Sequence, residues 1–227
     1  MNNQLLEQDE ELLPELFSFV QTSRSGTLLL SHPYYFSIIS NSDRCGLINR
    51  QFTEKKTMMD SLWQEGEFDY FIWQHEIPYR LDAFVQWTCN HPLRDRIPNK
   101  KYWETLRDIW ISEPMPHEKI EIWKRLLSSY RDERRWFMTG SEAAFLRDNA
   151  DATLTVYRGI NGQFYNNGIS WTLNRQVAIN IARGSSLGNP RVLTGTVDVY
   201  NVFAYIQARL QEEIISTHVN IISMEEL

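Results

Sequence analysis

The residue types that could do chemistry gather in three short pieces of the C-terminal half of the chain. The first is Val156-Tyr157-Arg158-Gly159, where an arginine ends an apolar run. The second is Gly168-Ile169-Ser170-Trp171-Thr172, and the third is Gln211-Glu212-Glu213-Ile214-Ile215. An arginine suits planar contacts to carboxylates or phosphates, although each piece taken singly also fits an ordinary strand.

Strand alternation predicts which of these side chains share a face. All three pieces have strand-like composition, and successive side chains of a strand point to opposite faces. Ser170 and Thr172 then share one face. Gln211 and Glu213 share a face as well, with Glu212 on the other, so only one of the two glutamates can join the cleft.

In their order and spacing the three pieces resemble the arginine–serine–glutamate class of mono-ADP-ribosyltransferases, which includes bacterial toxins and phage enzymes. The resemblance covers residues 140–227 and takes in the helix AINIARG and the strand RVLTGTV. The segment NVFAYI resembles the target-recognition turn of that family. The implied fold is α+β, with an N-terminal helical domain followed by a small ADP-ribosyltransferase-like split β-sheet core.

The resemblance implies a cofactor-binding set and makes NAD the co-substrate, with no metal. Arg158 matches the arginine that contacts the NAD phosphates and ribose, and Gly159 beside it lets the backbone approach a phosphate. Ser170, Trp171 and Thr172 complete the set.

The same resemblance implies a catalytic set of Glu213, Gln211 and Ser170. Glu213 matches the glutamate that hydrogen-bonds the ribose 2′-hydroxyl, and Ser170 matches the serine that orients it. Many relatives carry glutamate where this chain has Gln211, which points to an acceptor other than arginine. The loop GSSLGNP has no aromatic residue, so a ring that stacks on nicotinamide must come from Phe164, Tyr165, Phe203 or Tyr205.

The sequence does not identify the acceptor, and it is also compatible with a protein that has no catalytic activity. The leading function is ADP-ribose transfer to a macromolecule, as a toxin or phage–host conflict effector, with a neutralising antitoxin or inhibitor protein as a further partner. The acceptor is a protein or, as the alternative, a single-stranded RNA or DNA base. Transfer of ADP-ribose to water is a third chemical outcome. The alternative to an enzyme is a non-catalytic interaction protein with a degenerate core.

Composition places the chain among ordinary globular proteins. Its 227 residues are 42% hydrophobic and 23% charged, and the net charge of −6 argues against a protein held on duplex nucleic acid. Cys45 and Cys89 form no CxxC motif, the N-terminal segment is acidic, and no apolar run is as long as a membrane helix. We expect a cytoplasmic protein with no membrane partner.

The elements that must position these residues divide near residue 150. Helical spacing predicts helices in 5–20, 47–63, 78–89, 103–110 and 120–127, and Gly140-Ser141 caps a helix over 142–147. Strands are expected at 154–159, 168–173, 191–199, 212–216 and 219–223, with a helix over 174–184. The expected domains are a helical, Trp-rich domain, residues 1–148, for target selection or regulation, and an NAD-binding core, residues 149–227.

Two other kinds of site are disfavoured by spacing. The scattered histidines give no metal-ligand pattern, because Tyr79 stands four residues after His75 and Cys89-x-His91 has no second half. The tryptophans between Trp63 and Trp136 are interpreted as core rather than as a cofactor box.

Overall fold

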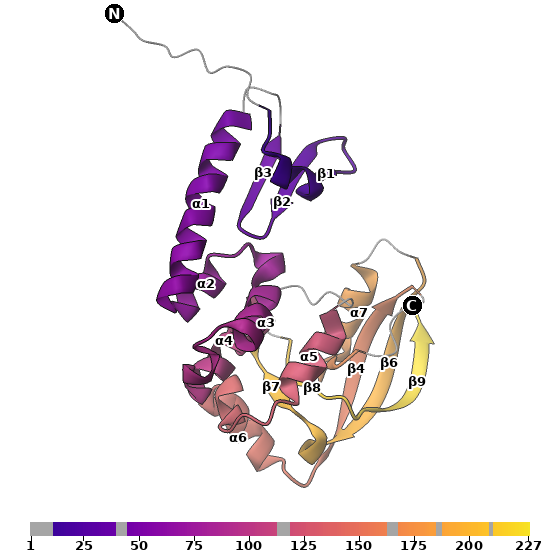
Figure 1. The fold of residues 1–227 in the computed structure, drawn as a ribbon. Helices are drawn as coiled ribbons and strands as arrows, with labels where there is room; N and C mark the ends of the chain where they lie inside the picture. The colour runs from indigo at the N-terminus through magenta and orange to yellow at the C-terminus, as the bar shows by residue number, and fades with distance from the viewer. Residues whose placement is uncertain (1–10, 40–44, 113–118, 163–167, 185–187, 209–210) are drawn as a thin grey trace, which may run out of the picture. The chain divides into compact units, whose positions relative to one another are not determined.

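The computed structural model describes residues 11–39, 45–112, 119–162, 168–184, 188–208 and 211–227 (Figure 1). It is a mixed fold of helices and two antiparallel sheets, which confirms the expected combination of helical and strand segments. The chain divides into two compact units, Met1–Ile97 and Pro98–Leu227. The division lies about fifty residues before the predicted one at 148/149, because the helices after Pro98 pack with the C-terminal sheet.

The first unit is not purely helical, contrary to expectation. It begins with a short 3-10 helix, Pro14–Phe19, and a three-stranded antiparallel sheet of β1 (Val20–Thr22), β2 (Leu28–His32) and β3 (Tyr35–Ile39). The strand sequences LLLSH and YFSII are rich in aliphatic and aromatic residues, which favour strands once a turn pairs them. Of the predicted helix 5–20, residues 5–10 lie outside the described residues, and residues 11–20 form only this short 3-10 helix before β1 begins at Val20.

Helices make up the rest of this unit. They are α1 (Cys45–Glu65), α2 (Phe68–Trp73), the 3-10 turn Ile77–Tyr79, α3 (Arg80–Asn90) and the 3-10 turn Arg94–Arg96. Two histidines are buried among them, and each ring bonds a backbone carbonyl: His75 that of Phe71 and His91 that of Trp63. Both histidines therefore have a structural role.

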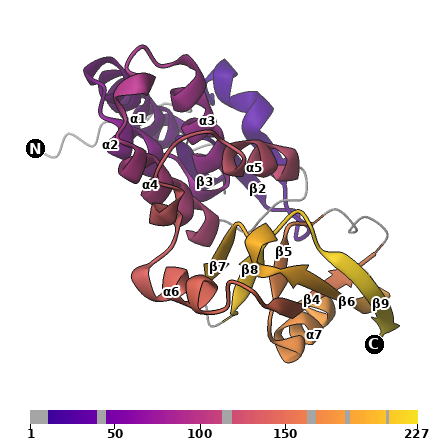
Figure 2. The ribbon, with the colours of Figure 1, turned by 90° about the horizontal axis from the view of Figure 1, so that it is seen from below.

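The second unit carries all the predicted site residues. Its helices are α4 (Asn99–Ser112), α5 (Ile120–Leu127), α6 (Gly140–Asp148) and α7 (Arg175–Arg183), with 3-10 turns at Arg134–Phe137 and Val199–Asn201. Its strands are β4 (Thr153–Asn161), β5 (Ser170–Thr172), β6 (Pro190–Asp198), β7 (Ala204–Ile206), β8 (Glu213–Ile215) and β9 (Asn220–Glu226). They form one antiparallel sheet in the order β7-β8-β5-β4-β6-β9, and α7 lies along β4 and β6 (Figures 1 and 2).

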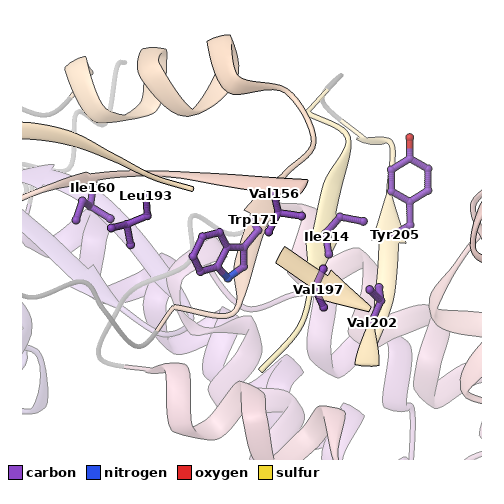
Figure 3. Packing of buried hydrophobic residues seen from close by; sticks show 8 residues of the cluster. All are labelled: Val156, Ile160, Trp171, Leu193, Val197, Val202, Tyr205 and Ile214. Carbon is purple, nitrogen blue, oxygen red and sulfur yellow. The ribbon is translucent and has the colours of Figure 1, made fainter. Parts of the chain in front are cut away.

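Apolar side chains from five strands, together with Val202 between the 3-10 turn and β7, pack together and fix this sheet. Trp171 lies among aliphatic residues of the neighbouring strands, and Tyr205 closes the cluster at the β7 end (Figure 3). The members are Val156, Ile160, Trp171, Leu193, Val197, Val202, Tyr205 and Ile214. Burial of this cluster determines which faces the strands turn inward and leaves the alternate residues for other contacts.

Two local predictions in this unit need correction. The segment NVFAYI, residues 201–206, was expected to be a turn. Its last three residues, 204–206, instead form strand β7, which is fully buried and pairs with β8. The N-cap of α6 is Thr139 rather than Gly140-Ser141, because the Thr139 side chain and Glu142 form a reciprocal capping box.

Candidate active site

The candidate site is built on three neighbouring strands. β8, β5 and β4 are adjacent, and the register pairs Tyr157 with Thr172 and Thr172 with Glu213. Directly paired residues of a sheet share a face, and so do residues two apart. The register therefore places Ser170, Thr172 and Glu213 on one face of the sheet.

Ser170 and Glu213 are in direct contact. The Ser170 hydroxyl donates a hydrogen bond to Oε1 of Glu213. Glu213 is half-buried at the first position of β8, whereas its neighbour Glu212 is exposed. The structure thus brings together the two residues that the sequence predicted as carboxylate and orienting hydroxyl.

Arg158 contacts this pair through the backbone, because its pairing with Leu193 of the core cluster puts it on the other face of the sheet. Its Nη1 donates to the carbonyl oxygen of Ser170 at 2.9 Å, not to the hydroxyl. Burial lowers the pKa of Arg158 to about 10, and Coulombic attraction by Glu213 opposes that shift. The guanidinium is therefore cationic at neutral pH although it is largely removed from water.

The guanidinium of Arg158 occupies space that only a glycine leaves open. A Cβ atom built on Gly168 would come within 1.5 Å of Nη1 and 1.6 Å of Cζ. The Nε of Arg158 is also buried and has no hydrogen-bond partner among the described residues. A buried cation with an unused N–H group is a suitable donor for an anionic ligand.

A tryptophan from the helical part of the same unit also contacts the carboxylate. The indole Nε1 of Trp110, in α4, donates to Oε2 of Glu213 at 3.1 Å. Each oxygen of Glu213 thus accepts from a side chain, Ser170 at Oε1 and Trp110 at Oε2. Sequence reasoning missed both Trp110 and Gly168, because Trp110 is 103 residues from Glu213 and the site pattern holds no signal for either.

The prediction that Gln211 and Glu213 share a face assumes a strand that includes both residues, and the structure has none there. β8 begins only at Glu213, and Glu212 has a φ of 45°, in the left-handed region. Because the backbone turns there, strand alternation cannot relate Gln211 to Glu213. What the structure provides at Gln211 is a backbone contact: the Thr172 hydroxyl donates to its carbonyl oxygen.

Three predicted cofactor-binding residues have structural contacts instead. A Cβ on Gly159 would lie 2.0 Å from the Ala178 carbonyl oxygen, so this glycine allows α7 to pack on β4. Trp171 is buried in the core cluster, and the Thr172 hydroxyl is engaged by Gln211 and by the Asn174 N–H. These contacts shape the strands around Ser170.

Of the four aromatic residues proposed to stack on nicotinamide, the structure describes two, Phe203 and Tyr205. Tyr205 is buried with its ring 4.1 Å from that of Phe145, and Phe203 packs against Phe137 with its ring 4.7 Å from the Arg134 guanidinium. Phe164 and Tyr165 lie outside the described residues.

A cavity of about 240 Å³ opens in the same unit but does not include Arg158, Ser170 or Glu213. Lys124, Arg134, Phe203, Ser216 and His218 contribute to its lining. Lys124 forms an ion pair with Glu121 at 2.7 Å, and the Arg134 guanidinium lies over the Phe203 ring. This cavity is separate from the candidate site.

Within the described ranges, no cluster of three or more His, Cys, Asp or Glu residues could hold a metal ion. The helices there are also too short or too polar to cross a membrane. Comparison with known proteins gives no match to a family model, a curated protein or a solved structure.

Proposed function

We propose that the chain is an NAD-dependent mono-ADP-ribosyltransferase whose site is Arg158, Ser170 and Glu213. The single observation that supports this most strongly is the hydrogen-bonded chain across three adjacent strands, in which Arg158 bonds the Ser170 backbone carbonyl and the Ser170 hydroxyl bonds the Glu213 carboxylate. Each is the residue type that the reaction requires.

NAD supplies a glycosidic bond that breaks with its electron pair leaving on nicotinamide, so that positive charge develops on the ribose. Glu213 places a carboxylate beside that charge, and a preorganised charge of this kind stabilises a transition state more than water can. Ser170 holds the carboxylate in one rotamer. An acceptor nucleophile then forms the new bond to ribose and loses its proton.

Arg158 would bind the phosphates of NAD. Its unused, buried Nε–H and its charge at neutral pH fit a dianionic group. Gly168 supports this assignment because it leaves room for the guanidinium beside β5.

The acceptor is proposed from the residue type at position 211. Gln211 replaces the glutamate of many relatives, so we propose a macromolecular acceptor other than arginine, in a protein. We assign its selection to the first unit, residues 1–97, since residues 98–148 share a unit with the site. An inhibitor protein acting in trans fits the same proposal, as does a role as a toxin or phage effector.

Release of nicotinamide from NAD tests the proposal, with Glu213→Gln and Glu212→Gln as a matched pair. Glu213→Gln keeps the shape of the side chain and removes its charge. We expect at least about a hundredfold loss of rate, as for one preorganised transition-state contact. Glu212→Gln should retain nearly the full rate, because that side chain is exposed.

Wild-type protein that releases no nicotinamide and transfers no label from NAD to cell protein or RNA would refute the proposal. Equal losses in the two variants would refute the assignment of Glu213. Release into water without transfer would instead indicate a glycohydrolase.

A further inference from the structure

We propose that Trp110 is a positioning residue for Glu213, so that the helical segment before residue 149 forms part of the active site. The inference rests on the proposed function for its catalytic meaning. Its structural content, an indole N–H that orients the carboxylate and favours its charged form, can be tested without any activity.

The geometry of the contact carries the inference. Trp110 Nε1 lies 3.1 Å from Oε2 of Glu213, and the Ser170 hydroxyl bonds the other oxygen. With a donor on each oxygen, rotation of the carboxylate about its terminal bond would break both hydrogen bonds. The carboxylate plane is therefore fixed from two directions, by a strand and by a helix.

The indole is itself held in place. Trp110 is only 5% exposed, and its ring packs edge-on against Trp123 of α5 with centroids 4.8 Å apart. Trp123 is 1% exposed. A donor that is locked by packing loses little entropy when it makes its bond, which is the requirement for preorganised support of a reacting group.

An indole N–H favours one protonation state of the carboxylate that it contacts. An indole N–H can donate but cannot accept, so it stabilises the ionised carboxylate and gives nothing to a protonated oxygen that must donate. Hydrogen bonds to the charged form of an acid favour that form. Trp110 thus helps to keep Glu213 charged in a half-buried position.

The same helix offers a matched control. Trp103, also in α4, is fully buried, and its indole N–H donates to the backbone carbonyl of Asp132 at 2.8 Å. A substitution at Trp103 removes a comparable ring and a comparable hydrogen bond without touching Glu213.

The first experiment follows the indole N–H signals of the full chain by 15N NMR. Glu213→Gln should move the Trp110 signal and leave the Trp103 signal in place. In a variant that keeps Glu213 but has Trp110 replaced by 3-benzothienylalanine, a ring of the same shape with sulfur for N–H, the carboxyl titration midpoint of Glu213 should rise by about one pH unit. An unmoved Trp110 signal or an unmoved midpoint would overturn the inference.

The second experiment measures nicotinamide release by the benzothienylalanine variant, by Trp110→Phe and by Trp103→Phe. Loss of the N–H should lower kcat about tenfold with little change in KM for NAD, and move the acid limb of the pH–rate profile to higher pH. Trp103→Phe should leave that limb unmoved. An unchanged kcat with an unmoved limb in the benzothienylalanine variant would overturn the positioning role, whereas an inactive wild type would overturn the proposed function and leave the NMR result standing.

Discussion

At the scale of single residues, the site depends on two positions that carry no reactive group. Gly168 leaves the space that the Arg158 guanidinium fills, and Trp110 supplies a donor to Glu213. Both act by geometry, one by the absence of a side chain and one by the packing of a large one. A residue-type pattern of arginine, serine and glutamate therefore describes only part of what makes the site.

Gly168→Ala should displace the Arg158 guanidinium without unfolding the protein. The new Cβ would lie within 1.5 Å of the end of that side chain, which is flexible and can move, rather than against backbone. Because the guanidinium would lose its bond to the Ser170 carbonyl, we expect NAD affinity to fall about tenfold or more in calorimetry.

Gly140→Ala is the control for this substitution, because its new Cβ would meet nothing within 4 Å. It should bind NAD as the wild type does. Undiminished affinity in Gly168→Ala would show that the observed position of Arg158 is not the one that binds phosphate.

At the scale of secondary-structure elements, one buried carboxylate ties two helices to the end of β7. Glu142 of α6 accepts from Arg107 of α4 at 2.9 Å, from the Thr139 backbone N–H at 2.7 Å and from the Gln207 backbone N–H at 2.8 Å. Its side chain is 2% exposed. This network joins the helical segment to the chain that leads from β7 to Gln211 and Glu213.

Glu142→Gln should destabilise the protein by about 3 kcal/mol or more in urea denaturation, because it leaves the Arg107 cation buried without its counter-charge. Glu121→Gln is the control, since it breaks an exposed ion pair with Lys124 and should cost less than about 1 kcal/mol. Equal stabilities of the two variants would contradict the importance of this network.

The pH dependence of the same contribution has a definite sign. Burial raises the pKa of Glu142, but its hydrogen bonds to the two backbone N–H groups and to Arg107 outweigh burial and hold the pKa below its usual value of 4.5. Stabilisation by Glu142 is therefore full above about pH 4.5 and is lost as the pH falls through the lower value in the folded protein.

At the scale of the whole molecule, the boundary between the two units determines which fragment we expect to fold and to be active. The helices α4, α5 and α6 belong with the sheet in the unit Pro98–Leu227. A core defined as residues 149–227 would lack Trp110, Arg107 and Glu142.

The fragment 98–227 should fold and release nicotinamide, whereas the fragment 149–227 should not give a cooperative thermal transition. The shorter fragment loses α6, which packs on β7, and exposes the fully buried Tyr205. Circular dichroism and nicotinamide release on both fragments check this. A folded and active fragment 149–227 would restore the boundary at 148/149.

The sequence by itself determined most of the local structure. Residues 47–63 and 120–127 lie in helices as their spacing predicts, and the runs at 154–159, 191–199 and 219–223 contain strands. Strand sequences around Ser170 and Glu213 were also recognisable, because alternation and helical periodicity are set by neighbours in the chain. The exceptions in the described residues include β1, β2 and β3, which lie where a helical domain was expected, and β7, whose residues are all buried and so show no alternation.

Tertiary structure decided what no local pattern encodes. It placed the Arg158 guanidinium on the Ser170 carbonyl beside Gly168, and it broke strand alternation at Glu212 so that Gln211 has no predictable face. It also brought Trp110 to Glu213 across 103 residues and moved the unit boundary to Ile97 and Pro98. Such contacts arise from the packing of distant segments, whose free energy depends on the complete fold and not on the spacing of residues along the chain.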